Sequence, residues 1–400
     1  MADVTVCIPA YCSQQFIAQT LRSLQQQTYN NFHVKIAIEP TEYSELVWQA
    51  CEPFLRDKRF EAQENHQVLG WSQNINSLLQ KITTPYFAIL PHDDIWHPEY
   101  LNILLNVLKD RAQASVAYAD MFMFGEGQGR KFMPIKQGSI GERLLSFYLA
   151  GAEAVPWRGV TRSEVLASGN FFSHKYCNSF AVECQWAQHL LLKGDAIRVS
   201  QPLYFKRKFG TKLDTVSRLW IKSFDTQNKL EALENHRAYM FSGFATAPAI
   251  DAEEKKIITL VWEIAMLRRF FSFLGNRVPL THNNLQRLAI LNQEVLKTQI
   301  NSNIRNQMQS RIELIIAKNA LASQEYQQAE EHARQSVAQD QMHWEALLFL
   351  SRLLLKRNEV HEALAFAAQS AAIAPQCGGV DPLIQKCGDK IKKLYACVNI

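Results

Sequence analysis

The stretch YFAILPHDDIWHPEYL, residues 86–101, joins a buried-looking strand to two adjacent acids and the start of a helix. Its first five residues are mostly apolar, and Asp93 and Asp94 follow after only Pro91 and His92. A short apolar run bounded by proline is typical of a fully buried strand. The segment therefore predicts a strand that ends in a pair of carboxylates and is followed at once by a helix.

The chain before this stretch alternates strand and helix patterns. VTVCIPAY (4–11) and FHVKIAIEP (32–40) predict strands, whereas FIAQTLRSLQQQT (16–28) and LGWSQNINSLLQKI (69–82) predict helices. After the aspartates, an apolar stripe at helical spacing predicts a further helix; its residues are Leu101, Leu104, Leu105 and Leu108. This order predicts an α/β fold with a parallel sheet covered by helices, whose ligands bind beyond the carboxyl ends of the strands.

Two carboxylates at such a strand end suit a hard divalent cation. Mg²⁺ and Mn²⁺ prefer oxygen ligands and often share their coordination shell with substrate phosphates. The alternative is that Asp94 or its neighbour caps the following helix. The residues alone leave both interpretations open.

Length and composition bound the function classes. A chain of 400 residues predicts two or three domains, and 47% hydrophobic with 20% charged residues is typical of a globular protein. The 43 basic residues are scattered among 38 acidic ones, so no nucleic-acid partner is expected. No apolar run reaches the roughly 18 to 20 residues of a membrane span, and the start has no signal-peptide pattern. We expect a cytoplasmic protein with no transmembrane segment, and peripheral attachment to the inner face of the membrane stays open.

The eight cysteines include no Cys-x-x-Cys pair. Reduced thiols serving as small core residues are the expected use. Cys377, Cys387 and Cys397 lie ten residues apart, but this spacing predicts no metal site.

Four segments taken together resemble the family 2 glycosyltransferases of GT-A fold. VTVCIPAY, TLRSLQQQTYNNF (20–32), ENHQVLGWSQNIN (64–76) and LPHDDIWHPEYL (90–101) occur in the family's order and at about its spacing. The resemblance covers about residues 1–215. It implies a nucleotide-sugar-binding, Rossmann-like mixed sheet and a nucleotide-diphosphate sugar as donor, with a UDP-sugar the leading candidate.

The resemblance also assigns roles to residues. It implies a Mg²⁺ or Mn²⁺ ion on Asp93 and Asp94. It implies a donor nucleotide site formed by Pro9, Ala10, Tyr11, Glu39, Gly70, Asn76 and Asp93. The chain departs from the family's pattern where Ile38-Glu39-Pro40-Thr41 replaces the usual Asp-Asp-Gly-Ser, and where Pro91 replaces a leading aspartate.

A catalytic base is implied further along. AVECQWAQHLLLKGDAIRVSQPLYFKRKFG (181–210) resembles the family's acidic helix, closing glycine, strand and tyrosine-containing segment. Counting back from Gly194 puts Glu183 at the position of the base that would deprotonate an acceptor hydroxyl during an inverting transfer. The alternative is a first-turn glutamate favoured by the helix dipole.

Other residues have less specific patterns. Trp71, Trp96 and Trp186 suit either a sugar-stacking platform or core packing. Trp157 and Arg158 are candidates for acceptor binding.

The basic cluster at 206–208 predicts a solvated face. Contact of Arg207 and Lys208 with a diphosphate is the alternative.

The second half of the chain is helical in pattern. Ala329, Ala333, Gln335, Ser336 and Ala338 recur thirty-four residues later as Ala363, Ala367, Gln369, Ser370 and Ala372. This repeat resembles tetratricopeptide repeats, which implies a protein partner or self-association through these helices. We expect a glycosyltransferase domain over 1–215, a helical linker over 216–311 and repeats over 312–400.

The resemblance implies a metal-dependent glycosyltransferase of hexosyltransferase type acting on a hydroxyl of a glycan, lipid-linked or protein acceptor. The alternative is a catalytically degenerate domain that works as a binding or assembly module through its repeats. Nucleotidyl transfer is disfavoured because no Gly-rich, Lys-containing phosphate loop follows the first strand.

Overall fold

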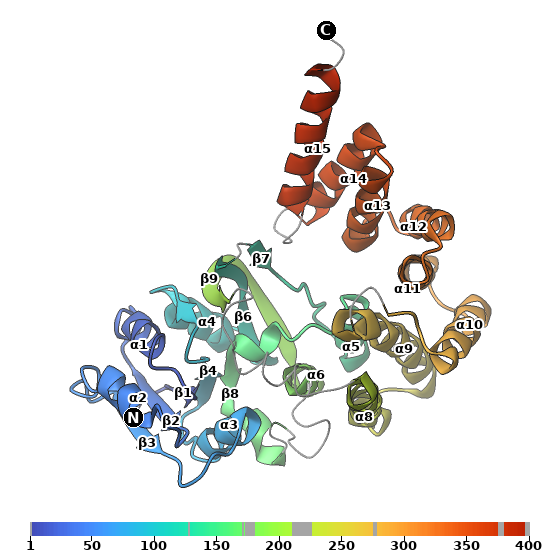
Figure 1. Ribbon diagram of the computed structural model, residues 1–400. Coiled ribbons are helices and arrows are strands. Elements are labelled where there is room, and N and C mark those ends of the chain that lie inside the picture. The colour runs from blue at the N-terminus through green and yellow to red at the C-terminus, as the bar shows by residue number, and fades with distance from the viewer. Residues whose placement is uncertain are drawn as a thin grey trace. The chain divides into compact units, whose positions relative to one another are not determined.

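The computed structural model describes residues 2–126, 129–169, 172, 181–209, 226–274, 278–374 and 380–396. The chain divides into two compact units, Met1–Ile250 and Asp251–Ile400, the second coloured gold to red in Figure 1. The first is a mixed α/β domain, and the described part of the second contains only helices. Cys177, Cys377 and Cys397 lie outside the described residues.

One mixed sheet forms the centre of the first unit (Figure 1). In spatial order its strands are β3 (Phe60–Glu64), β2 (Phe32–Ile38), β1 (Val4–Ala10), β4 (Tyr86–Ile89), β8 (Val160–Arg162), β6 (Ala114–Gly125), β9 (Asp195–Lys208) and β5 (Ile95–Trp96), and β7 (Gly129–Lys131) pairs with β6. Strands β3, β2, β1 and β4 are parallel, as the alternating pattern predicted. Strand β8 runs antiparallel to both β4 and β6, whereas β6 and β9 are parallel. The whole sheet is therefore mixed.

The helices that follow the first strands lie where the apolar periodicity placed them. They are α1 (Ile17–Gln25), α3 (Trp71–Leu79) and α4 (Tyr100–Lys109). The four leucines of the predicted stripe on α4 are all 0% exposed. Helix α2 (Ser44–Cys51) and the edge strand β3 were not predicted.

The carboxyl ends of β1, β2 and β4 meet at one edge of the sheet. Ala10 is paired with Ile38 in the parallel register. The Glu39 amide donates to the Ala10 carbonyl oxygen at 2.9 Å, and the Leu90 amide donates to the Cys7 carbonyl oxygen at 2.9 Å. Glu39 and the acidic turn after β4 therefore leave the same edge of the sheet, one on each side of β1.

Helix α6 (Val182–Lys193) runs directly into β9 through Gly194. A Cβ atom on Gly194 would lie 2.5 Å from the Gln113 carbonyl oxygen. Because any side chain would push this backbone away, the close approach requires glycine at the predicted end of the helix.

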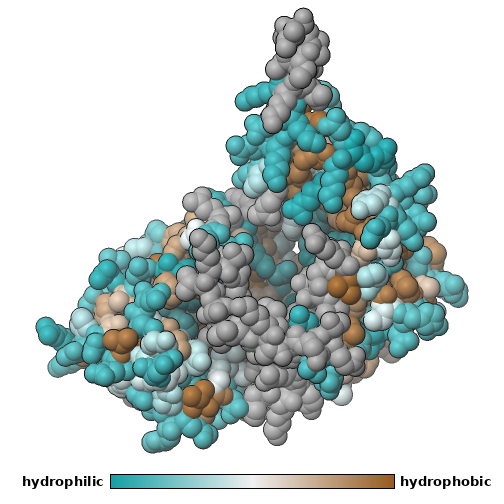
Figure 2. All heavy atoms as spheres, in the orientation of Figure 1, coloured by the Kyte–Doolittle hydropathy of each residue, from teal (hydrophilic) through white to brown (hydrophobic). Residues whose placement is uncertain are grey.

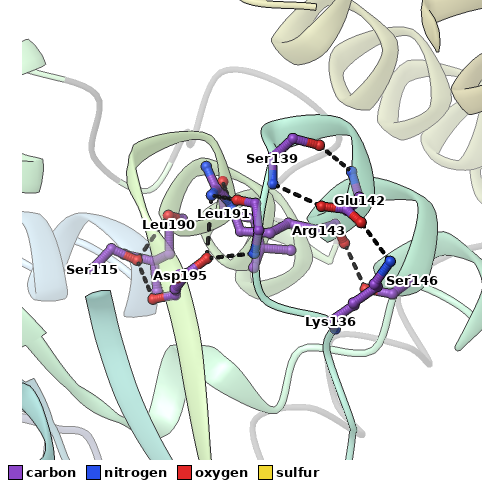
Figure 3. A network of polar contacts seen from close by, with 10 residues as sticks. Ser115, Lys136, Ser139, Glu142, Arg143, Ser146, Leu190, Leu191 and Asp195 are labelled. Atoms are coloured by element: carbon purple, nitrogen blue, oxygen red, sulfur yellow. Dashed lines mark hydrogen bonds and ion pairs between the residues drawn. The ribbon is translucent and has the colours of Figure 1, made fainter. Parts of the chain in front are cut away.

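A polar network holds α5 (Ile140–Leu149) against the end of α6 and the start of β9 (Figure 3). The Arg143 guanidinium donates from Nε to the Leu191 carbonyl oxygen at 2.7 Å and from a terminal nitrogen to Asp195 Oδ1 at 3.2 Å. Helix α5 itself begins with a capping box formed by Ser139 and Glu142. The network holds the carboxyl end of α6, the helix that carries Glu183 in its first turn.

Among the described residues of the first unit, the apolar side chains visible in Figure 2 form small, separate patches. Its exposed large apolar side chains are few, for example Tyr43, Leu46 and Val68. Isolated exposed apolar residues of this kind are normal for a folded domain.

The helices after β9 extend to the end of the described chain. Helix α8 (Thr226–Ala245) packs on α6 in the first unit. The second unit contains α9 (Ala252–Leu274), α10 (His282–Lys297), α11 (Ser302–Ala322), α12 (Tyr326–Gln339), α13 (Trp344–Lys356), α14 (Val360–Ile373) and α15 (Val380–Ala396). Among the described residues, no helix has the length and apolar character needed to cross a membrane.

The thirty-four-residue sequence repeat is also present in the structure. Six of its small residues are 0% exposed: Ala329, Ala333, Ser336, Ala363, Ala367 and Ser370. The other two, Ala338 and Ala372, are exposed. The Ser336 hydroxyl donates to the Ser310 carbonyl oxygen at 2.6 Å, and the Ser370 hydroxyl donates to the Trp344 carbonyl oxygen at 3.0 Å. Both the donors and the acceptors are thirty-four positions apart. The two helix pairs, α11 with α12 and α13 with α14, therefore pack through the same contact.

One buried histidine belongs to this repeat region. His343 is 6% exposed, and its Nδ1 atom lies 2.8 Å from the Ser310 hydroxyl. Burial, and then the charge of Arg311, hold the pKa of His343 well below its ordinary value. The neutral imidazole is therefore part of the folded core of the second unit.

Candidate active site

The acidic turn after β4 is anchored by hydrogen bonds from three directions. The Asp94 amide donates to the Pro91 carbonyl oxygen at 3.1 Å. The Thr20 hydroxyl, on α1, lies 2.9 Å from the His92 carbonyl oxygen and 2.8 Å from that of Asp94. His92 Nδ1 lies 3.0 Å from the Pro9 carbonyl oxygen at the end of β1. The turn is thereby fixed between α1 and β1.

Asp94 is buried and fully engaged by the protein. It is 2% exposed. Its Oδ1 accepts from the Arg207 amide at 2.9 Å and its Oδ2 accepts from the Tyr204 hydroxyl at 2.6 Å. Arg158 Nε lies 3.7 Å from the same Oδ2. Burial, and then the nearby charge of Asp93, raise the pKa of Asp94.

Asp93 has a different environment. It is half-buried, and its carbonyl oxygen accepts from Arg207 Nε at 3.1 Å. Within the described part of the chain, its carboxylate makes no hydrogen bond or ion pair. Neither aspartate caps the next helix, because α4 begins at Tyr100 with Glu99 at the N-cap. The expected helix-cap alternative is therefore wrong.

A divalent cation fits Asp93 better than Asp94. No group of three or more His, Cys, Asp or Glu side chains with metal-binding geometry occurs among the described residues. Mg²⁺ is commonly held by only one or two carboxylates, with phosphate oxygens and water completing its shell. The free carboxylate of Asp93 meets that requirement, whereas both oxygens of Asp94 already accept hydrogen bonds.

Arg158 places a buried cation beside Asp94. It lies at the end of the short helix η1 (Pro156–Arg158), and its side chain is 12% exposed. Its guanidinium carbon lies 4.4 Å from the centre of the Trp157 ring and 5.7 Å from that of Tyr204. The Tyr100 hydroxyl donates to the Arg158 carbonyl oxygen. The arginine is therefore fixed by aromatic rings and by its own backbone.

Glu183 and Lys206 lie within electrostatic range of Arg158. Glu183 is half-buried in the first turn of α6, and its charge acts on both cations. Repulsion from Arg158, and then burial, lower the pKa of Lys206 to about 8. The fold thus brings the predicted base, the buried cations and the acidic turn into one cluster.

The residues expected to bind the nucleotide line the neighbouring part of the edge. Glu39 is 2% exposed and accepts the Leu69 amide at 2.8 Å through Oε2. Its other carboxylate oxygen has no hydrogen-bond partner in the described structure. Burial raises the pKa of Glu39. Gly70, with φ of +78°, precedes α3 and has open space where a Cβ atom would lie.

The side chain of Asn76 binds protein backbone. Its amide nitrogen donates to the Phe172 carbonyl oxygen at 2.7 Å, and its oxygen accepts the Phe172 amide at 3.0 Å. Both polar atoms of the Asn76 side chain are therefore engaged by the Phe172 backbone.

The aromatic residues separate into two groups. The rings of Trp71, Trp157 and Phe172 lie with their centres 5.7–6.0 Å apart, and Phe172 stacks on Trp186 at 5.1 Å. Trp71 is half-buried, whereas Trp186 is 2% exposed and belongs to the core.

Trp96 belongs to a different part of the core. It is also 2% exposed and stacks on Tyr100 at 4.2 Å. Trp71 is thus the accessible member of the three tryptophans considered for sugar stacking.

Sequence reasoning missed two residues of this site, Tyr204 and Lys206. Both lie within β9, and alternate residues of a strand point to the same face. Since Tyr204 reaches Asp94, this alternation could have placed Lys206 on the same side. The expected solvated face at 206–208 is correct for Lys208, which is exposed, but wrong for the half-buried Lys206 and Arg207.

Comparison with known proteins bears on the family and the fold. The family model described as "Glycosyl transferase family 2" matches residues 5–163. An "Uncharacterized glycosyltransferase" of Haemophilus influenzae is 26% identical over 123 residues, which are 30% of this chain and 38% of that protein. The match thus spans well under half of the relative's length.

Solved structures show a similar fold. TarS 1–349 of S. aureus has a TM-score of 0.55 and 14% identity, covering 84% of this chain and 91% of that one. The same protein in complex with UDP-GlcNAc has a TM-score of 0.56 and 15% identity, with the same coverage. The first unit therefore has a GT-A-like fold followed by a helical region, and residues 5–163 form a Glycosyl transferase family 2 domain.

Proposed function

We propose that this chain transfers a sugar from a nucleotide-diphosphate sugar to an acceptor hydroxyl. The observation that carries the proposal is that Arg158 lies beside Asp94 in the acidic turn and within electrostatic range of Glu183 and Lys206. Open α/β sheets bind their ligands beyond the carboxyl ends of the strands, where this turn lies. The family 2 domain over residues 5–163 supports the same reaction class.

The donor nucleotide would occupy the edge between Glu39 and the acidic turn. The unpaired carboxylate oxygen of Glu39 can accept hydrogen bonds from a base or ribose. The loop at Pro9, Ala10 and Tyr11 leaves β1 beside it, and Gly70 leaves room for close approach. UDP-GlcNAc, bound by TarS, makes a UDP-sugar the first donor to test.

The proposed metal is Mg²⁺ or Mn²⁺, held by Asp93 together with the donor's phosphates. When bound, it would neutralise charge on the leaving diphosphate. Asp94 would orient the turn from its buried position instead of ligating the ion directly.

Glu183 is the proposed general base of an inverting transfer. Its carboxylate takes the proton of the acceptor hydroxyl as that oxygen bonds to the anomeric carbon. The bond from the anomeric carbon to the diphosphate oxygen breaks on the opposite side, and the nucleoside diphosphate leaves with the electron pair. The acceptor is a hydroxyl of a glycan, a lipid-linked sugar or a protein.

The remaining chain would serve assembly. We propose residues 1–215 as the catalytic domain, 216–311 as a helical extension and 312–400 as a repeat region for a protein partner or a second copy. Since Pro91 occupies the position of a leading aspartate, a degenerate binding module is the second candidate.

Thermal-shift screening tests the proposal. Purified protein is heated with UDP, GDP, dTDP or CMP, each with Mn²⁺ or with EDTA, because a ligand of the folded state raises the melting temperature. A shift with one nucleotide names the donor class, and the matching nucleotide sugars are then assayed for transfer and hydrolysis. Absence of any shift would overturn the transferase proposal and favour the binding module.

A further inference from the structure

Arg158 and Lys206 are two neighbouring cations with unused hydrogen-bonding capacity. Arg158 Nε is buried and has no hydrogen-bond partner among the described residues. The Lys206 ammonium makes no hydrogen bond or ion pair in the part of the chain that the structure describes. A buried donor without a partner is unfavourable, so such groups are usually completed by a ligand or water.

Both cations face the same side of the acidic turn. Tyr204 and Lys206 are alternate residues of β9 and therefore share one face of the strand. The Tyr204 hydroxyl reaches Asp94 on that face, and Arg158 lies 5.7 Å from the centre of the Tyr204 ring. Lys206 thus lies on the side of β9 that Asp94 and Arg158 occupy.

The nearby acids attract the two cations without using their hydrogen-bond donors. Asp94 and Glu183 act on both side chains through charge. The 3.7 Å separation between Arg158 Nε and Asp94 Oδ2 is too long for a hydrogen bond. Among the described residues, neither acid hydrogen-bonds to the Lys206 ammonium.

We propose that Arg158 and Lys206 form the protein's own cationic site for the donor's diphosphate, so that nucleotide binding does not depend on a divalent cation alone. This inference rests on the proposed function. Phosphate oxygens accept charge-assisted hydrogen bonds from guanidinium and ammonium groups. The pair lies on the same strand edge as Asp93, the proposed metal ligand, so the diphosphate would bridge the two.

The test compares UDP with uridine, which lacks the diphosphate. Calorimetric titrations in EDTA use the full chain and its Lys206→Gln and Lys206→Arg variants. Lys193→Gln is the matched control, since Lys193 is exposed at the far end of α6, about 15 Å along the helix from Glu183. Melting temperatures without ligand verify that each variant is folded.

We expect wild-type protein to bind UDP in EDTA. Lys206→Gln should weaken UDP binding by about tenfold or more, without changing uridine binding. Lys206→Arg should retain most of the UDP affinity, and Lys193→Gln should bind UDP as tightly as wild type does.

Two results would overturn the inference while leaving the proposed function intact: UDP binding that requires Mn²⁺, or equal UDP binding by Lys206→Gln and wild type. Failure of UDP, GDP and dTDP to bind with or without Mn²⁺ would overturn both.

Discussion

Replacing Tyr204 by phenylalanine removes the hydroxyl that donates to Asp94 Oδ2 at 2.6 Å. The two residues are 1% and 2% exposed, so water does not readily take the place of the lost donor. The aromatic ring is retained, and the Arg207 amide remains on the other carboxylate oxygen. Since a hydrogen bond to a charged group contributes about 1.5–3 kcal/mol, the free energy of unfolding should fall by about that amount at pH 8.

Urea unfolding followed by circular dichroism measures this loss, and thermal melting provides a second measure. For a unit of this size, about 2–4 °C per kcal/mol predicts a fall of about 3–12 °C in the melting temperature. Tyr29→Phe is the matched control, because the Tyr29 hydroxyl donates to Asp3 close to the surface. The control should lose less stability, since solvent replaces an exposed partner.

A double-mutant cycle with Asp94→Asn isolates the contact itself. The two substitutions should be coupled by about 1 kcal/mol or more, because the residues share one buried hydrogen bond. Equal losses in Tyr204→Phe and Tyr29→Phe, or additive effects in the cycle, would refute the role of Asp94 as the buried anchor of the turn.

Further predictions concern catalysis, metal binding and pH. Glu183→Gln should lower the transfer rate by about a hundredfold or more at unchanged nucleotide affinity. The assay uses the donor found by screening, and full activity of the variant would exclude Glu183 as the base. Asp93→Asn should abolish the Mn²⁺-dependent part of nucleotide binding with little change in melting temperature. Asp94→Asn should lower the melting temperature. The reverse pattern would contradict Asp93 as the metal ligand and Asp94 as the buried anchor. The pKa of His343 is lowered in the folded state, so below about pH 6.5 the unfolded chain binds a proton that the folded one does not. Stability of the second unit should therefore decrease as pH falls through that range, and a His343→Gln variant with the same pH slope would contradict this.

The elements near the acidic turn could be predicted because their apolar patterns are strong. β1 and β4 are almost continuous apolar runs, and the stripe on α4 repeats at helical spacing. The edge strand β3 was missed because its sequence, FEAQE, is mostly polar and only Phe60 is buried. An edge strand needs one buried position, so its pattern differs little from that of a loop.

The repeat region shows how sequence periodicity and packing agree. The thirty-four-residue spacing of small residues predicted close approach of paired helices, and Ser336 and Ser370 occupy equivalent buried sites. The repeated alanines Ala338 and Ala372 are exposed, so the spacing alone did not tell which small residues pack between helices. The hydrogen bonds that these serines make to Ser310 and Trp344 could not be predicted, because their acceptors are backbone oxygens.

The resemblance to family 2 glycosyltransferases implied the helix that carries Glu183. Local periodicity in the sequence predicted β1, β2, β4, α1, α3 and α4 and put the acidic pair directly after β4, but it missed α2 and β3. It did not distinguish Asp93 from Asp94, two adjacent residues of the same type. Tertiary structure decided that difference: β9 brings Tyr204, 110 positions away in the chain, against Asp94 and leaves Asp93 free. A strand pairing between distant segments sets which carboxylate is desolvated, and desolvation separates an anchoring acid from one that can bind a ligand.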